Sequence, residues 1–161
     1  MRRVVSNSTP IIVLANVGRQ DLLKDVYGEV VIPEAVRYEV LAKRDDAARF
    51  LLSRPAWVRT EVAPEPDEVS LMRARLHAGE VEAIMLAKST DADLVILDDN
   101  AAKKVAKHLG LGVTGTLGVL VRAKREGCLD DVSRVLDELE RLGFYMSERV
   151  KRAVLTRAGE A

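Results

Sequence analysis

Residues 93–99 of this 161-residue chain are Asp93-Leu94-Val95-Ile96-Leu97-Asp98-Asp99. A nearly continuous apolar run of this length is typical of a central parallel strand that helices cover on both faces. The run stops at an acidic pair, and the basic amphipathic pattern of a helix follows at residues 101–109. The segment therefore predicts an α/β fold with acidic residues at the carboxyl edge of a parallel sheet.

Strand and helix patterns alternate outward from this segment. Short apolar runs predict further strands at residues 3–6, 29–32, 57–62 and 110–113. Capping residues and helical periodicity predict helices that open at Ser8 and at Pro33, and others at residues 45–52, after Gly79, from about 116 to 127, at 130–142 and at 147–157. A turn is expected at residues 64–67, where two prolines lie close together.

The alternation predicts a three-layer α/β/α domain with a central, mostly parallel sheet. A chain of 161 residues suits one domain with a real core. We expect one domain over residues 1–161, with its core at about 3–126 and a helical C-terminal extension at about 130–158.

Composition narrows the functional class. The 25 basic and 25 acidic residues cancel, so the composition does not indicate a globally basic nucleic-acid binder, although a local basic face remains open. The single cysteine, Cys128, excludes an internal disulfide framework and a thiolate zinc cluster. No segment approaches the roughly 18 unbroken apolar residues of a membrane span. We expect a cytoplasmic protein without a membrane segment.

Single acidic residues lie at the ends of apolar segments along the chain. They are Glu39, Glu80 and Asp98, and Asn7 lies at the first strand-to-helix junction. Strand ends and the starts of the next helices converge in an α/β fold, so the three acids can gather into one metal site. At helical spacing Glu80 faces the core, whereas Glu82 points largely away.

Each of these residues also has an interpretation that involves no site. Glu39 lies four positions before Lys43 and could form a surface ion pair with it. Glu80 could stabilise the start of a helix through its dipole, and one of Asp98 and Asp99 is expected to cap the next helix. Asn7 and Ser8 could form only a turn and a cap, and the lysine-rich helix is most often a solvated face.

Five short motifs occur in the order found in PIN-domain nucleases. They are Ser6-Asn7-Ser8, Pro33-Glu34, Gly79-Glu80, Leu97-Asp98-Asp99 and Thr114-Gly115-Thr116, each within an apolar context. Together they resemble this family over about residues 3–157, and most of all its prokaryotic branch related to VapC-type toxins. The resemblance implies a ribonuclease that depends on Mg2+ or Mn2+.

The resemblance also assigns roles to residues. It maps the catalytic positions to Asn7, Glu39, Glu80 and Asp98, and the metal-holding positions to Glu39, Glu80, Asp98 and Asp99. Ser8, Glu82 and Thr116 are expected to support the site, and Lys103, Lys104 and Arg122 to contact RNA. The chain departs from the family pattern at Asn7, where many members have Asp. An amide oxygen can still bind a hard cation, but it brings no negative charge.

Two hypotheses from different functional classes follow. The first is a single-stranded ribonuclease that acts as the toxin of a type II toxin–antitoxin pair and is inhibited by a small antitoxin. The second is a catalytically weak or inactive module that binds RNA or protein, because Asn7 replaces the usual Asp. A nucleotide-binding role is disfavoured because the glycine-rich fingerprint is missing. A homodimer is expected, with a surface around Ile11, Leu14 and the C-terminal helices.

Overall fold

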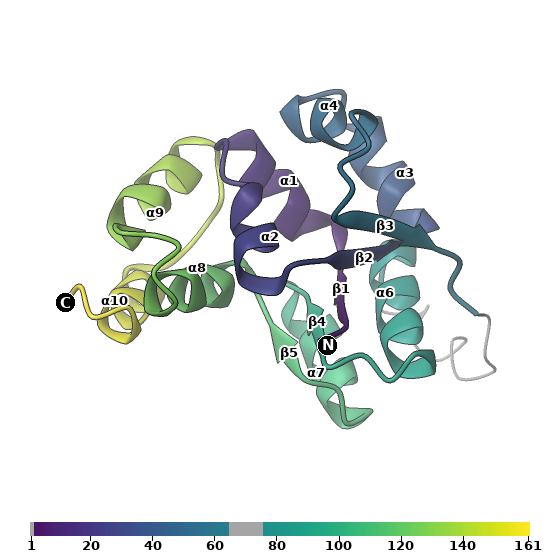
Figure 1. Ribbon diagram of the computed structural model, residues 1–161. Coiled ribbons are helices and arrows are strands. Elements are labelled where there is room, and N and C mark those ends of the chain that lie inside the picture. Colours follow the sequence, from purple (N-terminus) through teal and green to yellow (C-terminus); the bar gives the residue numbers. More distant parts are fainter. Residues whose placement is uncertain (1, 65–75) are drawn as a thin grey trace.

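The computed structural model describes residues 2–64 and 76–161, which form a five-stranded sheet with helices on both faces (Figure 1). The strands lie in the order β3-β2-β1-β4-β5, and every neighbouring pair is parallel. The elements in chain order are β1 (Val4–Ser6), α1 (Ser8–Asn16), α2 (Asp21–Tyr27), β2 (Val30–Pro33), α3 (Glu34–Ala42), α4 (Asp46–Leu52), β3 (Val58–Glu61), α6 (Ala78–Ser89), β4 (Leu94–Ile96), α7 (Asn100–His108), β5 (Val113–Thr114), α8 (Thr116–Arg125), α9 (Val132–Arg141) and α10 (Glu148–Arg157). The predicted three-layer α/β architecture is confirmed.

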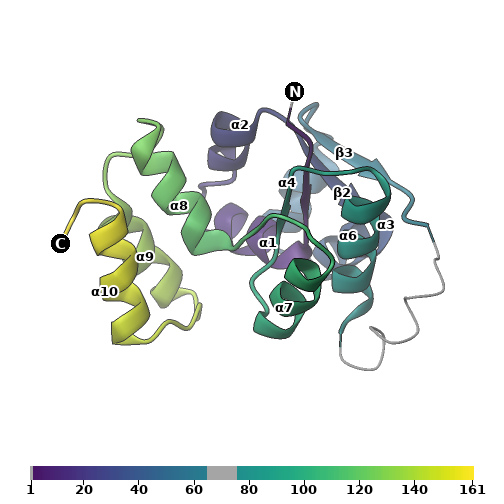
Figure 2. The same cartoon turned by 90° about the horizontal axis from the view of Figure 1, so that it is seen from below.

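The central strands are apolar on both faces because helices cover both faces. Successive residues of a strand point to opposite sides. Val4 and Ile96 therefore belong to the core cluster shared with α1, α2 and α8, whereas Val5 and Val95 belong to the cluster shared with α6 and α7. Figures 1 and 2 show these two helical layers. This two-sided burial explains why residues 94–97 lack the polar alternation of a half-exposed strand.

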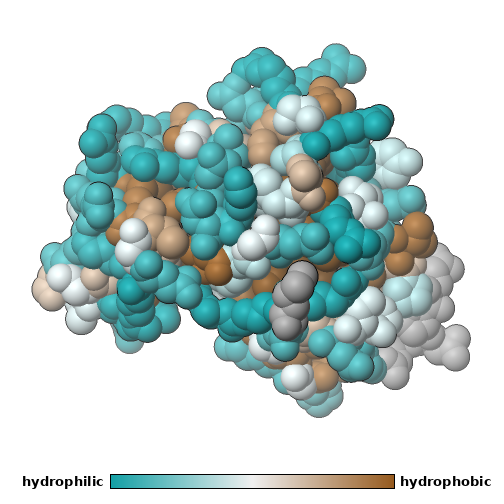
Figure 3. Space-filling view, viewed as in Figure 1, coloured by the Kyte–Doolittle hydropathy of each residue, from teal (hydrophilic) through white to brown (hydrophobic). Residues whose placement is uncertain are grey.

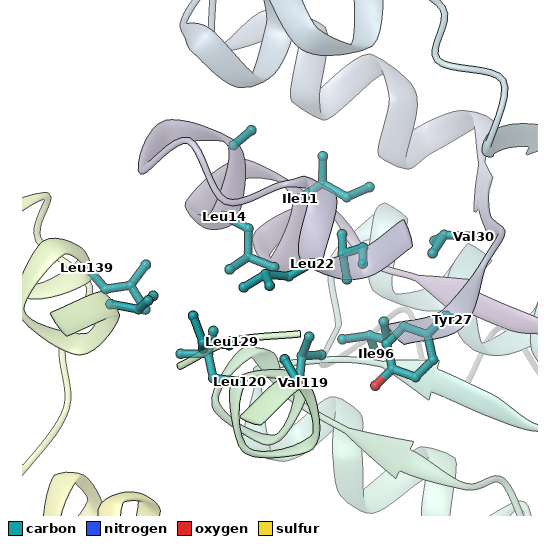
Figure 4. Packing of buried hydrophobic residues seen from close by; sticks show 14 of the residues in the cluster. Ile11, Leu14, Leu22, Tyr27, Val30, Ile96, Val119, Leu120, Leu129 and Leu139 are labelled. Atoms are coloured by element: carbon teal, nitrogen blue, oxygen red, sulfur yellow. The ribbon is translucent and has the colours of Figure 1, made fainter. Parts of the chain in front are cut away.

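The larger core lies between α1, the sheet and the C-terminal helices. Leu14 of α1, Leu120 of α8 and Leu139 of α9 are essentially inaccessible to solvent and converge there (Figure 4). The chain end fastens this part of the molecule, because the Glu160 carboxylate accepts hydrogen bonds from the backbone N–H groups of Val132 and Ser133. The helices after residue 126 thus belong to the same core cluster as the sheet and pack against α8.

Two features lie outside the predictions made from sequence. Helix α2 was not predicted, and its start carries no side-chain cap that a sequence pattern would show, because Gln20 makes no capping hydrogen bond. Its end is marked by Gly28, whose positive φ of 79° suits a residue without Cβ. The turn expected at 64–67 lies outside the described residues, apart from Pro64.

The expected dimer surface is wrong at Ile11 and Leu14. These side chains are 1% and 0% exposed, because they pack inside the core of their own chain. A second copy cannot contact them in the folded protein. The half-buried residues of the same helix, Ile12 and Val13, point instead toward the C-terminal helices and line a small pocket there.

The outer surface of the helices is mainly hydrophilic on the face seen in Figure 3. Small hydrophobic areas interrupt it, as on most protein surfaces. Within residues 2–64 and 76–161, no helix has the length and apolar character that crossing a membrane requires.

The strand order creates a switch point between β1 and β4, and the carboxyl ends of these strands form the edge of the sheet where a site is expected. From β1 the chain proceeds to β2 and β3 on one side, and it returns to β4 and β5 on the other. Ligands of open α/β sheets bind outside the carboxyl ends of the strands at such a switch point. Asn7 follows β1 and Asp98 follows β4, so both lie at this edge.

The packing of α9 on the sheet-bound helices gives a stability test. Leu136 is fully buried in the larger core cluster, so Leu136→Ala should lower the free energy of unfolding by about 2–5 kcal/mol. Leu52 of α4, which is 61% exposed, serves as the control and should change it by less than about 0.5 kcal/mol when replaced by Ala. Urea denaturation measures both. A separate early transition confined to the C-terminal helices would show that they form an independent unit.

Candidate functional site

Asn7 places a buried oxygen at the switch point of the sheet. Its backbone N–H donates to the carbonyl of Ile96 over 3.0 Å, which continues the pairing of β1 with β4 beyond the strand ends. The residue is only 4% exposed, and its Oδ1 accepts no hydrogen bond from any described residue. A buried acceptor without a partner costs about 1–3 kcal/mol. Such an atom is suited to bind a cation or a ligand donor.

Glu39 is oriented toward Asn7 by two donors. Ser8 Oγ donates to Oε2 over 2.7 Å, and the backbone N–H of Gly79 donates to Oε1 over 3.0 Å. A Cβ at position 79 would lie 2.4 Å from Glu39 Oε1, so only glycine allows this approach. Glu39 and Lys43 are both described, and they do not form the ion pair that their spacing in the sequence allowed. Glu39 is therefore held by α6 and by the start of α1.

Glu80 is the most buried acid of the site. It lies in the first turn of α6, is 6% exposed, and accepts a hydrogen bond from the His77 backbone N–H over 3.0 Å. Burial raises the pKa of Glu80 above its ordinary value, and the negative charges of Asp99 and Glu39 raise it further. The hydrogen bond and the charge of His77 act in the opposite direction. Glu80 thus points inward, as predicted from its spacing, and also acts as a helix cap.

Asp98 and Asp99 have different tasks. Asp98 accepts two hydrogen bonds from Thr116, from the backbone N–H over 2.8 Å and from Oγ1 over 2.6 Å. Asp99 caps α7 by accepting from the Ala102 N–H over 2.9 Å. The expectation that one of the pair caps a helix is confirmed, and the cap is Asp99. Asp98 therefore remains as the acid that the end of β4 presents.

One cleft of about 640 Å³ collects three of the four expected residues. Asn7, Glu39 and Glu80 line it, together with Lys43 and His77. Asp98 instead lines a separate groove, together with residues of α7 and the start of α8. From the sequence, Lys43 was considered only as an ion-pair partner of Glu39, so its place in the cleft was missed. Gly79 was also missed, although a glycine in the first turn of a helix is a costly choice that invites an explanation.

The expected supporting residues fall into two groups. Ser8 and Thr116 each orient one carboxylate. Glu82 of α6, which is half-exposed, accepts a hydrogen bond from the Ala35 N–H at the start of α3 over 3.2 Å, so it positions the helix that carries Glu39. Neither Ser8 nor Thr116 is aimed freely into solvent.

The residues expected to contact RNA are also separated by the fold. Lys103 lines the groove that contains Asp98, whereas Lys104 is exposed outside its lining. The guanidinium of Arg122 lies 5.8 Å from the ring centre of Tyr27 and pairs with Glu126 over 3.5 Å. Arg122 is thus engaged in packing α8 against α2.

The residues of the cleft fit a hard divalent cation by the chemistry of their oxygens. In the part of the chain that the structure describes, no three His, Cys, Asp or Glu side chains form a ready metal cluster. However, the unpartnered Oδ1 belongs to Asn7, which lines the same cleft as two carboxylates, and such oxygen donors are those that Mg2+ and Mn2+ prefer. Glu39 and Glu80 keep free lone pairs beside their hydrogen bonds, because a carboxylate offers about four acceptor positions.

Glu80→Gln tests the electrostatics of this cleft. Because the pKa of Glu80 is raised in the folded chain, the folded state holds this proton more tightly than the unfolded state does. The contribution of Glu80 to stability is therefore present at low pH and is lost as the pH rises above 4.5, the ordinary value, through the raised pKa. Glutamine keeps an oxygen for the His77 N–H and does not ionise.

Urea denaturation in EDTA should show that, above pH 4.5, the native chain loses stability relative to the Gln variant. Glu148→Gln, in the exposed first turn of α10, is the control and should leave the pH profile as in the native chain. Identical pH profiles for the native chain and Glu80→Gln would contradict a buried, ionising carboxylate.

Comparisons with known proteins identify the family of this chain. The model of the family DUF3368, described as a PIN domain, matches residues 3–160. Among solved structures, the chain is similar to a PilT N-terminus domain protein, SSO1118, from the hyperthermophilic archaeon Sulfolobus solfataricus P2, with 18% identity and a TM-score of 0.48 over 92% of this chain and 98% of that one. No curated protein matches the sequence. The chain belongs to the PIN-domain family, whose fold is generally that of nucleases that depend on divalent metal ions.

Proposed function

We propose that this protein is a ribonuclease that cleaves single-stranded RNA with the help of Mg2+ or Mn2+. The observation that carries the proposal is the buried, unpartnered Oδ1 of Asn7, which lies in one cleft with Glu39 and Glu80. Asp98 follows the strand next to Asn7 and completes the proposed catalytic set. Family membership supports the reaction class, and the choice of RNA is our own proposal.

The proposed site divides its work among its own residues. Asn7, Glu39, Glu80 and Asp98 would supply the oxygens that hold the cation, while Ser8 and Thr116 keep two of the carboxylates in place. Asp99 adds negative charge near Glu80 and otherwise caps α7. A bound divalent ion would make a water molecule more acidic and neutralise charge on the phosphate.

Lys43 and His77 distinguish this cleft from a purely acidic one. Both line it beside Asn7. Lys43 supplies a positive charge that attracts a phosphate, which offsets the repulsion between the carboxylates and a polyanion. His77 is exposed at the start of α6, where its ring can approach a substrate in the cleft. We propose that both position the RNA backbone.

The biological role we propose is that of a toxin in a type II toxin–antitoxin pair. A small antitoxin protein would then be the natural partner, with a segment that fills the cleft and contacts the acids. The resemblance to VapC-type toxins in five ordered motifs supports this role. A neighbouring short reading frame that encodes a DNA-binding antitoxin would favour it, and the absence of such a frame would favour a housekeeping role.

A second copy of the chain is a further proposed partner. Ile12 and Val13 of α1 line a small pocket beside Leu142, which is 60% exposed. This surface replaces the expected one at Ile11 and Leu14, which are buried. Its apolar character supports a homodimer through Ile12, Val13 and Leu142.

The alternative function is an RNA- or protein-binding module with little or no catalysis. The observation in its favour is that Asn7 occupies the central position without a charge, so the cleft attracts a cation less strongly than a site with three carboxylates there would. Fold alone does not separate the two functions, because one fold can support both.

Asp98→Asn tests whether RNA cleavage comes from the proposed site rather than from a contaminating nuclease, and a matched control variant tests for misfolding. The substitution keeps the shape of the side chain and removes a charge, so metal-dependent cleavage of an unstructured RNA should fall by more than about 100-fold. The matched control is Asp91→Asn at the opposite end of β4. Asp91 is exposed with a positive φ of 50°, which asparagine also tolerates.

Cleavage should survive in the control and stop in EDTA for every chain. Undiminished cleavage by well-folded Asp98→Asn would show that the site is misplaced. No cleavage by the folded native chain with either metal ion would favour the binding module.

Asn7→Asp tests whether the missing charge limits the site. A carboxylate at this buried position should strengthen Mn2+ binding by about tenfold, which corresponds to about 1.4 kcal/mol. Titration calorimetry measures the affinity, and thermal unfolding in EDTA shows the cost of adding a third acid beside Glu39 and Glu80. An unchanged Mn2+ affinity would mean that Asn7 does not contact the cation.

A further inference from the structure

The groove that contains Asp98 has features that the proposed chemistry does not use. It has a volume of about 580 Å³ and is lined by α7, the start of α8, and the segment that leads into α10. Figure 2 shows α7 and α10 on either side of the start of α8. Asp98 lies among its lining residues, so the groove is continuous with the acidic edge of the sheet.

Among the described residues that line the groove, three cations accompany one acid, Asp98. Lys103 and Lys107 come from α7, and Arg157 comes from α10. Their side chains form no ion pair with any acid of residues 2–64 and 76–161. The groove is thus locally basic, although the chain as a whole has no net charge.

Two of the three cations, Lys103 and Lys107, follow one face of α7 away from Asp98. A Cβ at Gly115 would lie 2.8 Å from Asp98 Oδ1 and 2.9 Å from Lys103 Nζ, so the acid and the amine flank the same glycine. Lys107 follows Lys103 by four positions and therefore lies on the same face of α7, one turn farther along. Such a row suits successive phosphates of a strand whose scissile bond lies at Asp98.

Tyr145, in the segment before α10, adds an aromatic side chain to the lining of the groove. Its side chain is 87% exposed and makes no hydrogen bond or ring contact with the other described residues. Its neighbours are anchored, since Met146 is buried and the Phe144 N–H donates to the carbonyl of Leu139 over 3.0 Å. The backbone is therefore fixed on both sides while the ring remains in solvent, where a flat ligand can stack on it.

We propose that this groove binds single-stranded RNA, with phosphates on Lys103, Lys107 and Arg157 and an unpaired base stacked on Tyr145. The proposal deepens the proposed function and rests on it, because Asp98 belongs to both surfaces. Unpaired bases offer a free face for stacking, whereas the bases of a duplex already stack on one another. The combination of phosphate-binding cations with an exposed ring therefore favours a single strand over a duplex.

The stacking is tested by binding of a fluorescent, unstructured oligouridine in EDTA, where cleavage cannot occur. Tyr145→Leu keeps an apolar side chain but loses the ring, so the affinity should fall by about 5- to 100-fold. Tyr145→Phe keeps the ring and should bind within about twofold of the native chain. Tyr38→Leu is the matched control, because Tyr38 is 72% exposed and lines a different pocket. Equal affinities of the Leu and Phe variants would overturn the stacking.

The phosphate contacts are tested by the salt dependence of the same binding. Lys107→Ala and Arg157→Ala should each reduce the slope of log affinity against log salt by about 0.7, the value for one contact to a single strand. Lys104→Ala and Arg152→Ala, on the same helices but outside the groove lining, should leave the slope unchanged. Unchanged slopes in all four variants would overturn the path along the groove.

These outcomes separate the groove from the catalytic proposal. A native chain that binds the strand through Tyr145 but never cleaves RNA would retain the groove and refute the nuclease. If the native chain cleaves RNA and its Tyr145→Leu variant binds the strand as tightly as the native chain does, the nuclease is retained and the groove is refuted. The oligomeric state of the Tyr145→Leu variant is measured by analytical ultracentrifugation. If this variant loses a dimer together with RNA binding, Tyr145 lies at an interface between copies and the proposal is overturned.

Discussion

The parallel pairing of β1 with β4 is the constraint on which the rest of the site depends. It joins two segments about 90 residues apart in sequence, with Val4 opposite Leu94 and Ser6 opposite Ile96. The hydrogen bond from the Asn7 N–H to the Ile96 carbonyl extends this pairing past the strand ends. As a result, one buried amide oxygen and one strand-end acid are fixed at the same edge, where two diverging halves of the sheet open a crevice.

Around this edge each carboxylate is oriented by donors of its own. Ser8 and Gly79 hold Glu39, Thr116 holds Asp98, and His77 holds Glu80. These bonds keep like charges apart and still leave acceptor positions open. The cost of the arrangement is visible at Glu80, whose raised pKa reflects burial together with the charges of Asp99 and Glu39. A cation in this cleft would relieve that repulsion, which links local stability to metal binding.

Much of the fold could be predicted from local patterns, because apolar runs and capping residues act over a few positions. Residues 93–99 indicated a central strand, and helical spacing correctly placed Glu80 inward. The contacts that complete the site could not be predicted in this way. The approach of Gly79 to Glu39 and the missing partner of Asn7 Oδ1 depend on segments far apart in the chain. Ile11 and Leu14 form an apolar face that resembles an interface in sequence, but the helices α3, α4 and α8 pack against α1 and bury it.

The account makes Asn7 part of a cation site, although it is the uncharged member of the set. The most direct test is a crystal structure of the protein soaked in Mn2+, with an anomalous difference map calculated at the manganese absorption edge. A peak within coordination distance of Asn7 Oδ1 and of the carboxylates of Glu39, Glu80 or Asp98 is the expected result. A map in which manganese occupies other sites and leaves this cleft empty would contradict the central claim.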